Sequence, residues 1–149
     1  MVLNQDFSEF IKLLNFHNVQ YLIVDGYAVA FHGYPRYTKD LDIWISTDIE
    51  NAGSMISVLK DFGFGSLKIS KDDFTKPERI RQLGCPPNRI DIITTAEGLV
   101  FRDCYPSRIE TEIEGLRITF IDLTNLRNNK RAIGRYQDLA ALENLGKTE

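Results

Sequence analysis

The chain lacks the features that mark secreted and membrane proteins. It has only two cysteines, Cys85 and Cys104, whose spacing fits neither a metal motif nor a disulfide framework. No apolar run approaches the roughly 20 residues needed to span a bilayer. The opening stretch MVLNQDFSEF carries acids where a signal peptide has positive charge and a long apolar core. We therefore expect a cytoplasmic protein with free thiols and no membrane contact.

Basic residues are also fewer than acidic residues. The net charge of −3 does not favour a general attraction to nucleic acid. The chain has no long basic tract or aromatic platform of the kind that binds extended single-stranded RNA. There is no internal repeat or linker rich in serine and proline, so the 149 residues predict one domain spanning residues 1–149.

What the chain does contain is a mixture of helical and strand patterns. Apolar residues at helical spacing, caps and glycine stops predict helices at 7–16, 27–33, 47–60 and, on either side of Gly134, from 122 onward. Alternating or continuous apolar runs predict strands at 19–24, 39–46, 78–84 and 89–95, with a hairpin at 108–122 that turns at Glu114-Gly115. The stretch CPPN reads as a turn. These patterns predict an α/β (α+β) fold, with a mixed sheet flanked by helices and a C-terminal helical segment.

Acidic residues interrupt two of the expected strands. Asp40 and Asp42, in KDLDIWIS, are two positions apart and therefore project from the same face of a strand. Asp91, in RIDIITT, is a third acid among apolar neighbours. If these strands pair, the three carboxylates converge, and a hard divalent cation such as Mg²⁺ is their natural partner. Two alternatives stay open: a solvated edge strand for Asp40 and Asp42, and a simple ion pair of Asp91 with Arg89.

The turn VDGYAV follows the first expected strand. Gly26 there begins a short helix, whose free N–H groups and positive end suit a phosphate. Glycine also lets a ligand approach the backbone closely. This signal is weak alone, and the nearby Asp40 and Asp42 strengthen it.

These motifs, in this order, resemble the nucleotidyltransferase superfamily with the DNA-polymerase-beta-like fold. That family has a glycine pair after the first strand, D-x-D on the next strand and a third acid on a later one. The sequence is most similar to small bacterial members related to abortive-infection and toxin–antitoxin nucleotidyltransferases. Three runs carry this likeness across nearly the whole chain: YAVAFHGYPRYTKDLDIWI, QLGCPPNRIDIIT and NKRAIGRYQDLAALENL.

The resemblance implies a metal-dependent enzyme that moves a nucleoside monophosphate from an NTP to a hydroxyl of RNA, such as a tRNA, or of a protein. It also implies a role in a toxin–antitoxin pair, with a cognate toxin or antitoxin as partner. Asp40, Asp42 and Asp91 would be catalytic and would bind Mg²⁺ or Mn²⁺, and Asp138 would orient the C-terminal basic segment. The residues implied to bind the nucleotide are Asp25, Gly26, Tyr27, Arg36, Lys39, Lys130 and Arg135.

One departure from the family pattern lies in the phosphate cradle itself. The family has Gly-Gly where this chain has Asp25-Gly26, and a carboxylate beside the phosphates would repel them. The side chain could avoid this by rotating away, by capping the helix or by joining the metal ligands. The alternative function is therefore a catalytically impaired protein of the same fold that binds a nucleotide or a partner as a regulator. A third option is a purely structural interaction protein.

Overall fold

The computed structural model describes residues 3–34, 38–65, 68–84 and 88–145, and it confirms a mixed α/β fold. Its six-stranded sheet has the order β3-β4-β2-β1-β6-β5. The strands are β1 Tyr21–Val24, β2 Asp40–Ile45, β3 Ile80–Leu83, β4 Arg89–Ile93, β5 Ile109–Ile113 and β6 Leu116–Phe120. The helices are α1 Gln5–Phe16, α2 Asp25–Phe31, α3 Ile49–Leu59, α4 Asp72–Thr75, α5 Phe101–Cys104, α6 Leu123–Ile133 and α7 Tyr136–Asn144, with short helical turns at Lys60–Phe64 and Tyr105–Ser107.

The strand β2 lies inside the sheet. It pairs with β1 in antiparallel fashion on one side and with β4 in parallel fashion on the other. Its apolar residues Ile43, Trp44 and Ile45 are all buried. The alternative of a solvated edge strand for Asp40 and Asp42 is therefore wrong.

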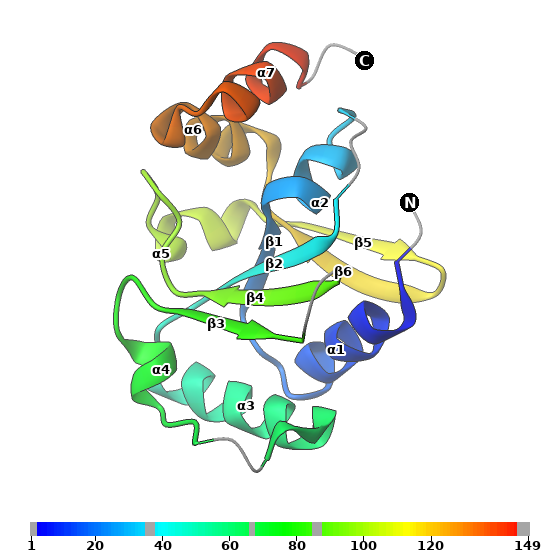
Figure 1. The fold of residues 1–149 in the computed structure, drawn as a ribbon, viewed down its shortest axis with the longest axis vertical. Helices are drawn as coiled ribbons and strands as arrows, with labels where there is room; N and C mark the ends of the chain where they lie inside the picture. The colour runs from blue at the N-terminus through cyan, green and yellow to red at the C-terminus, as the bar shows by residue number, and fades with distance from the viewer. Residues whose placement is uncertain (1–2, 35–37, 66–67, 85–87, 146–149) are drawn as a thin grey trace.

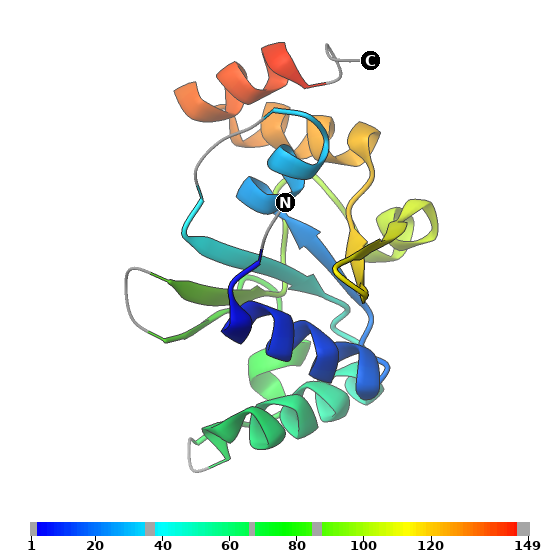
Figure 2. The ribbon, with the colours of Figure 1, turned by 90° about the vertical axis from the view of Figure 1, so that its right-hand side faces the viewer.

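Helices lie on both sides of the sheet. In both views α1, α3 and α4 lie toward one end of the molecule, and α2, α6 and α7 gather at the other (Figures 1 and 2). The residues of α1 expected to face the core are buried, as their helical spacing predicted: Phe7, Phe10, Ile11 and Leu14. The short helix α2 contacts β1, β2 and α6, and so joins the sheet to the C-terminal helices.

Local signals placed several boundaries correctly. The β5–β6 hairpin turns at Glu114 and Gly115, which both have positive φ angles, of 52° and 80°. Asp122 caps α6 by accepting a hydrogen bond from the backbone N–H of Asn125, and Gly134 ends that helix with a φ of 71°. His32, at the C-terminal end of α2, forms a 2.7 Å hydrogen bond with the carbonyl of Ile121.

Other features were not expected from the sequence. The helix α2 begins at Asp25, before Gly26. The helices α4 and α5 were not predicted, and Phe101 of α5 packs edge to face against Trp44 with ring centroids 5.1 Å apart. Most of the expected CPPN turn lies outside the described residues. Across the described part of the chain, no helix has the length and apolar character needed to cross a membrane.

Candidate active site

The three predicted carboxylates lie on neighbouring strands. The parallel pairing of β2 with β4 places Asp42 opposite Asp91 and Asp40 opposite Arg89. Residues paired in this way, and residues two apart on one strand, project from the same face. The strand pairing on which convergence depended is therefore confirmed, and Arg89 lies on the same face as the acids.

Arg89 bridges two of these acids. Its Nε donates to Asp91 Oδ1 at 2.8 Å, and its Nη2 donates to Asp91 Oδ2 at 3.1 Å and to Asp40 Oδ2 at 3.3 Å. The ion pair of Asp91 with Arg89, left open from the sequence, is therefore present and extends to Asp40. Such charge-assisted contacts offset the repulsion between the two carboxylates.

Asp42 is in a different electrostatic position. It is half-buried, and in the described part of the chain no lysine or arginine forms an ion pair with it. Burial raises its pKa to about 8, and the charges of Asp25, Asp91 and Asp40 and a hydrogen bond with Asp91 act in the same direction. Without a cation, Asp42 is therefore mainly protonated at neutral pH.

The turn after β1 lies beside this cluster. Val24, the last residue of β1, is paired with Asp42, and Asp25 follows with a φ of 59°. This is the left-handed region that favours glycine. At Gly26, an added Cβ would lie 2.6 Å from Thr38 Oγ1 and 2.9 Å from Thr38 Cβ, so this position requires glycine. Aspartate thus occupies a position whose backbone favours glycine, next to a position that requires it.

The Asp25 carboxylate is directed toward a buried lysine. Lys130 of α6 has a fully buried side chain that donates to Asp25 Oδ1 and lies 3.2 Å from Asp138 Oδ1. Arg135 Nε donates to Asp138 Oδ2 at 2.7 Å. Burial alone would raise the pKa of Asp138, but the hydrogen bond from Arg135 and the charge of Lys130 hold it below the ordinary value. Asp25, Lys130, Asp138 and Arg135 thus form one network of alternating charge.

The other residues expected to bind the nucleotide differ in position. Tyr27 is buried, and its ring packs edge to face against Phe7 with centroids 5.8 Å apart. Lys39 is exposed just before β2. The Arg135 side chain is 55% exposed, so it is open to solvent although it is bonded to Asp138. Arg36 lies outside the described residues.

The donor chemistry of the cluster fits a hard divalent cation such as Mg²⁺ or Mn²⁺. Carboxylate oxygens are the ligands that such ions prefer, and the raised pKa of Asp42 marks a point where positive charge is lacking. Within the described ranges, no three acidic, histidine or cysteine side chains are already arranged to hold a metal. Arg89 and Lys130 neutralise the acids around Asp42, which leaves Asp42 as the first candidate ligand.

Solved structures share this fold over nearly the whole chain. A protein from Thermotoga maritima described as a nucleotidyltransferase aligns with a TM-score of 0.64 and 15% identity, covering 92% of this chain and 88% of that one. The lincosamide antibiotic adenylyltransferase LnuA, solved with lincomycin bound, aligns with a TM-score of 0.60 and 17% identity over 99% of both chains. An antigenic nucleotidyltransferase-like protein from Paracoccidioides brasiliensis aligns with a TM-score of 0.55 and 18% identity, covering 92% of this chain and 72% of that one.

The chain therefore has the nucleotidyltransferase fold, and the predicted resemblance to this superfamily is confirmed at the level of the fold. No protein-family model and no curated protein sequence matches the chain. The likeness to abortive-infection and toxin–antitoxin proteins stays a prediction.

The buried ion pairs of Lys130 generate a prediction about stability. Replacing Lys130 with methionine keeps the length of the side chain but leaves Asp25 and the buried Asp138 without this cation. We expect a loss of about 3 kcal/mol in the free energy of unfolding, because breaking a buried pair strands its partner. Urea denaturation measures this loss. The matched control is Arg131→Met, at the next and exposed position, which should change stability by less than about 0.5 kcal/mol. Equal stability of Lys130→Met and the wild type would contradict the network.

The raised pKa of Asp42 generates a prediction about pH. In the unfolded chain Asp42 titrates near 3.8, and in the folded protein near 8. Between these values the folded state holds a proton that the unfolded state has lost, so stability falls as pH rises through this window. With EDTA present, the melting temperature of the wild type should fall between about pH 5 and about pH 8.5, and Asp42→Asn should flatten this decline.

Added Mg²⁺ provides a second readout in the same melting experiment. At about pH 8 a bound cation should raise the melting temperature of the wild type by mass action. The shift should disappear in the double variant Asp40→Asn/Asp42→Asn. An equal shift in that variant would place the metal elsewhere, and a pH profile unchanged by Asp42→Asn would show that Asp42 titrates normally.

Proposed function

We propose that this protein transfers a nucleoside monophosphate from an NTP to a hydroxyl group. The observation that carries the proposal is the pairing of Asp42 with Asp91 on adjacent parallel strands, directly beside the Gly26 turn. This arrangement puts oxygen ligands for a cation next to a backbone turn that can accept phosphate. The fold shared with nucleotidyltransferases supports the proposal.

The carboxylates have distinct roles in this proposal. Asp40, Asp42 and Asp91 would hold Mg²⁺ or Mn²⁺, which when bound would neutralise charge on the phosphate oxygens. Asp91 accepts the proton of the attacking hydroxyl. The hydroxyl oxygen forms a bond to the α-phosphorus, the bond from that phosphorus to the bridging oxygen breaks, and pyrophosphate leaves. Arg89 holds Asp91 and Asp40 in place before the substrates arrive.

Positive charge and backbone groups bind the triphosphate in this scheme. The turn at Asp25, Gly26 and Tyr27 contributes backbone N–H groups. The ring of Tyr27 is packed in the core, so Tyr27 takes part through its backbone and not through its side chain. Lys39, Arg135 and Arg36 supply positive side chains. The charge of Lys130 is already shared by Asp25 and Asp138, so its main role is to hold the Asp25 carboxylate.

The acceptor proposed first is a hydroxyl of RNA, such as a tRNA end, or of a protein. A small-molecule hydroxyl is a second candidate, because LnuA, which aligns along 99% of this chain, is an antibiotic adenylyltransferase. ATP is one donor that fits the proposal. We further propose that the protein is located in the cytoplasm of a bacterial cell. We also propose that it forms a toxin–antitoxin pair with a partner protein.

The position of Asp25 bears on the alternative, a protein that binds a nucleotide or a partner without turnover. Two unit charges about 4 Å apart repel by about 4 kcal/mol at an effective dielectric of about 20. Asp25, however, is hydrogen-bonded to Lys130, which offsets its charge. The repulsion that motivated the alternative is thus reduced by the fold, and transfer is the proposal that we favour.

A comparison of variants at Asp25 and Asp42 tests this function. Purified protein is incubated with labelled NTPs, Mg²⁺ and cell extract, and NTP affinity is measured by calorimetry at fixed Mg²⁺. We expect weak transfer by the wild type and loss of transfer in Asp42→Asn. Asp25→Gly should bind NTP at least about tenfold more tightly, since it removes a carboxylate and releases the charge of Lys130. The positive φ of Asp25 suits glycine without strain.

Asp25→Asn is the matched control, because it keeps the side-chain volume and removes only the charge. A gain in NTP affinity in both Asp25→Gly and Asp25→Asn assigns the effect to the lost charge. A gain in Asp25→Gly alone assigns it to the space that the side chain had filled. Binding without turnover in every form would support the regulator. Absence of both NTP binding and labelling, with any nucleotide, would contradict the proposed function.

A further inference from the structure

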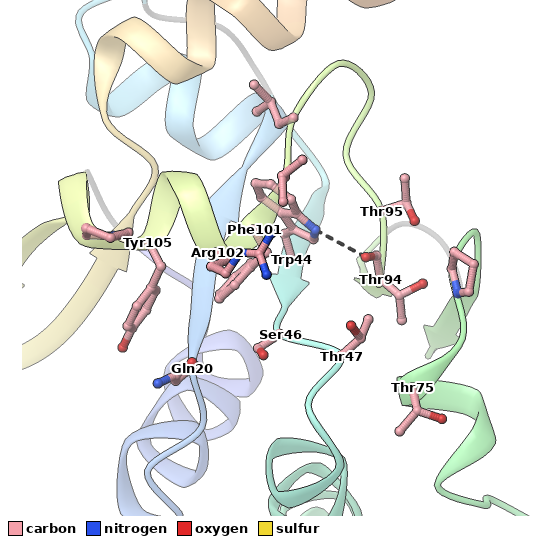
Figure 3. A pocket seen from close by; sticks show the side chains of 14 residues that line it. Gln20, Trp44, Ser46, Thr47, Thr75, Thr94, Thr95, Phe101, Arg102 and Tyr105 are labelled. Atoms are coloured by element: carbon pink, nitrogen blue, oxygen red, sulfur yellow. Dashed lines mark hydrogen bonds between the residues drawn. The ribbon is translucent and has the colours of Figure 1, made fainter.

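A cavity of about 640 Å³ lies away from the carboxylates, at the carboxyl ends of β2 and β4 (Figure 3). Four of its lining residues come directly after these strands: Ser46 and Thr47 after β2, and Thr94 and Thr95 after β4. Small-molecule pockets typically have volumes of about 300 to 1,000 Å³, and ligands of open α/β sheets often bind beyond the carboxyl ends of the strands. Asp42 and Ser46 are four positions apart along the chain, or about 13 Å at strand spacing. The cavity is therefore separate from the candidate active site.

The lining of the cavity has two chemically different sides. Phe101 and Tyr105 form an aromatic side, and their rings stack with centroids 5.3 Å apart. Thr47 and Thr75 lie on the other side (Figure 3). A molecule that fills the space would meet an aromatic surface along one face and hydroxyl groups along the other.

Some of the polar groups around the cavity are already used. The hydroxyls of Thr94 and Thr95 accept hydrogen bonds from the backbone N–H groups of Arg79 and Glu78, at 2.9 and 2.8 Å. Among the described residues, the hydroxyls of Thr47 and Thr75 have no hydrogen-bond partner. These two hydroxyls are thus available to a ligand.

The charge of the lining is unusual for this protein. Among the lining residues that the structure describes, Arg102 is the one charged side chain and none is an acid, although the chain as a whole has a net charge of −3. Arg102 is exposed and forms no ion pair within the described ranges. The guanidinium therefore has its donors free for an anion.

We propose that this cavity binds a small organic anion with an aromatic body. The aromatic body packs against Phe101 and Tyr105, and the acidic group accepts hydrogen bonds from Arg102 and from a threonine hydroxyl. The charge of such a ligand separates this cavity from the carboxylate cluster, whose acids would repel an anion when no cation is bound. The inference does not depend on nucleotidyl transfer.

Trp44 provides a direct readout of this site. It is the only tryptophan of the chain, it lines the cavity, and its Nε1 donates to the carbonyl of Thr94 at 3.3 Å. The probe is 8-anilino-1-naphthalenesulfonate, an aromatic anion that accepts excitation energy from tryptophan. N-phenyl-1-naphthylamine has the same aromatic body without the sulfonate, and serves as the matched neutral probe.

We expect the sulfonate probe to quench Trp44 in a saturable titration with one site per chain. Arg102→Gln should weaken its binding by about fivefold, the usual size of one exposed charge contact, and should leave the neutral probe unchanged. Arg127→Gln, which removes an exposed arginine of α6 away from the cavity, should alter neither titration. Asp42→Asn should also bind the sulfonate probe as the wild type does.

Any of four results would overturn the inference. One is saturation by the sulfonate probe without quenching of Trp44. The second is an equal effect of Arg102→Gln on the two probes, and the third is an equal effect of Arg102→Gln and Arg127→Gln on the sulfonate probe. The fourth is loss of binding in Asp42→Asn, which would place the probe at the carboxylate cluster. Because Arg102 and Arg127 are both exposed, neither substitution removes core packing, and a thermal melt of each variant confirms that it is folded.

Discussion

The contact of Lys130 with Asp25 and Asp138 is the constraint on which the site depends. A lysine with a fully buried side chain is costly unless carboxylates surround it. Its two partners come from the start of α2 and from α7, while Lys130 itself belongs to α6. One buried charge thus ties the turn after β1 to both C-terminal helices. It also fixes the direction of the Asp25 carboxylate beside the place proposed for the phosphates.

Arg89 acts in the same way on the other side of the cluster. It neutralises Asp91 and Asp40, while Lys130 neutralises Asp25, so two cations of the chain offset three of the four acids. Asp42 lies between them and has the raised pKa that follows. This distribution explains how three acids of the sheet and Asp25 of α2 can lie close together, and why Asp42 is the group most in need of a further cation.

The sequence predicted what depends on local chemistry. Helical spacing located α1, the alternation on both sides of Glu114-Gly115 located the hairpin, and Asp122 marked the start of α6. The convergence of Asp40, Asp42 and Asp91 was predictable only on the condition that their strands pair, and the pairing register met that condition. The position of Arg89, two residues before Asp91 on the same strand face, gave the one local signal for its ion pair.

Contacts between distant segments could not be predicted in this way. Asp25 and Lys130 are 105 positions apart, and no pattern in either segment indicates that they meet. The short helix α5 has too few residues to show a helical period in the sequence. Its Phe101 nevertheless packs against Trp44 and lines the cavity proposed to bind an anion. Both features arise from the way the sheet brings remote segments together.

The most direct test of the account is a crystal structure with Mg²⁺ and a non-hydrolysable ATP analogue. The account predicts that the phosphate chain lies against the backbone at Gly26, with Mg²⁺ bound by Asp40, Asp42 and Asp91 and with Asp25 still paired to Lys130. A nucleotide bound elsewhere, or bound beside the carboxylates without any metal while Asp42 stays unligated, would contradict it.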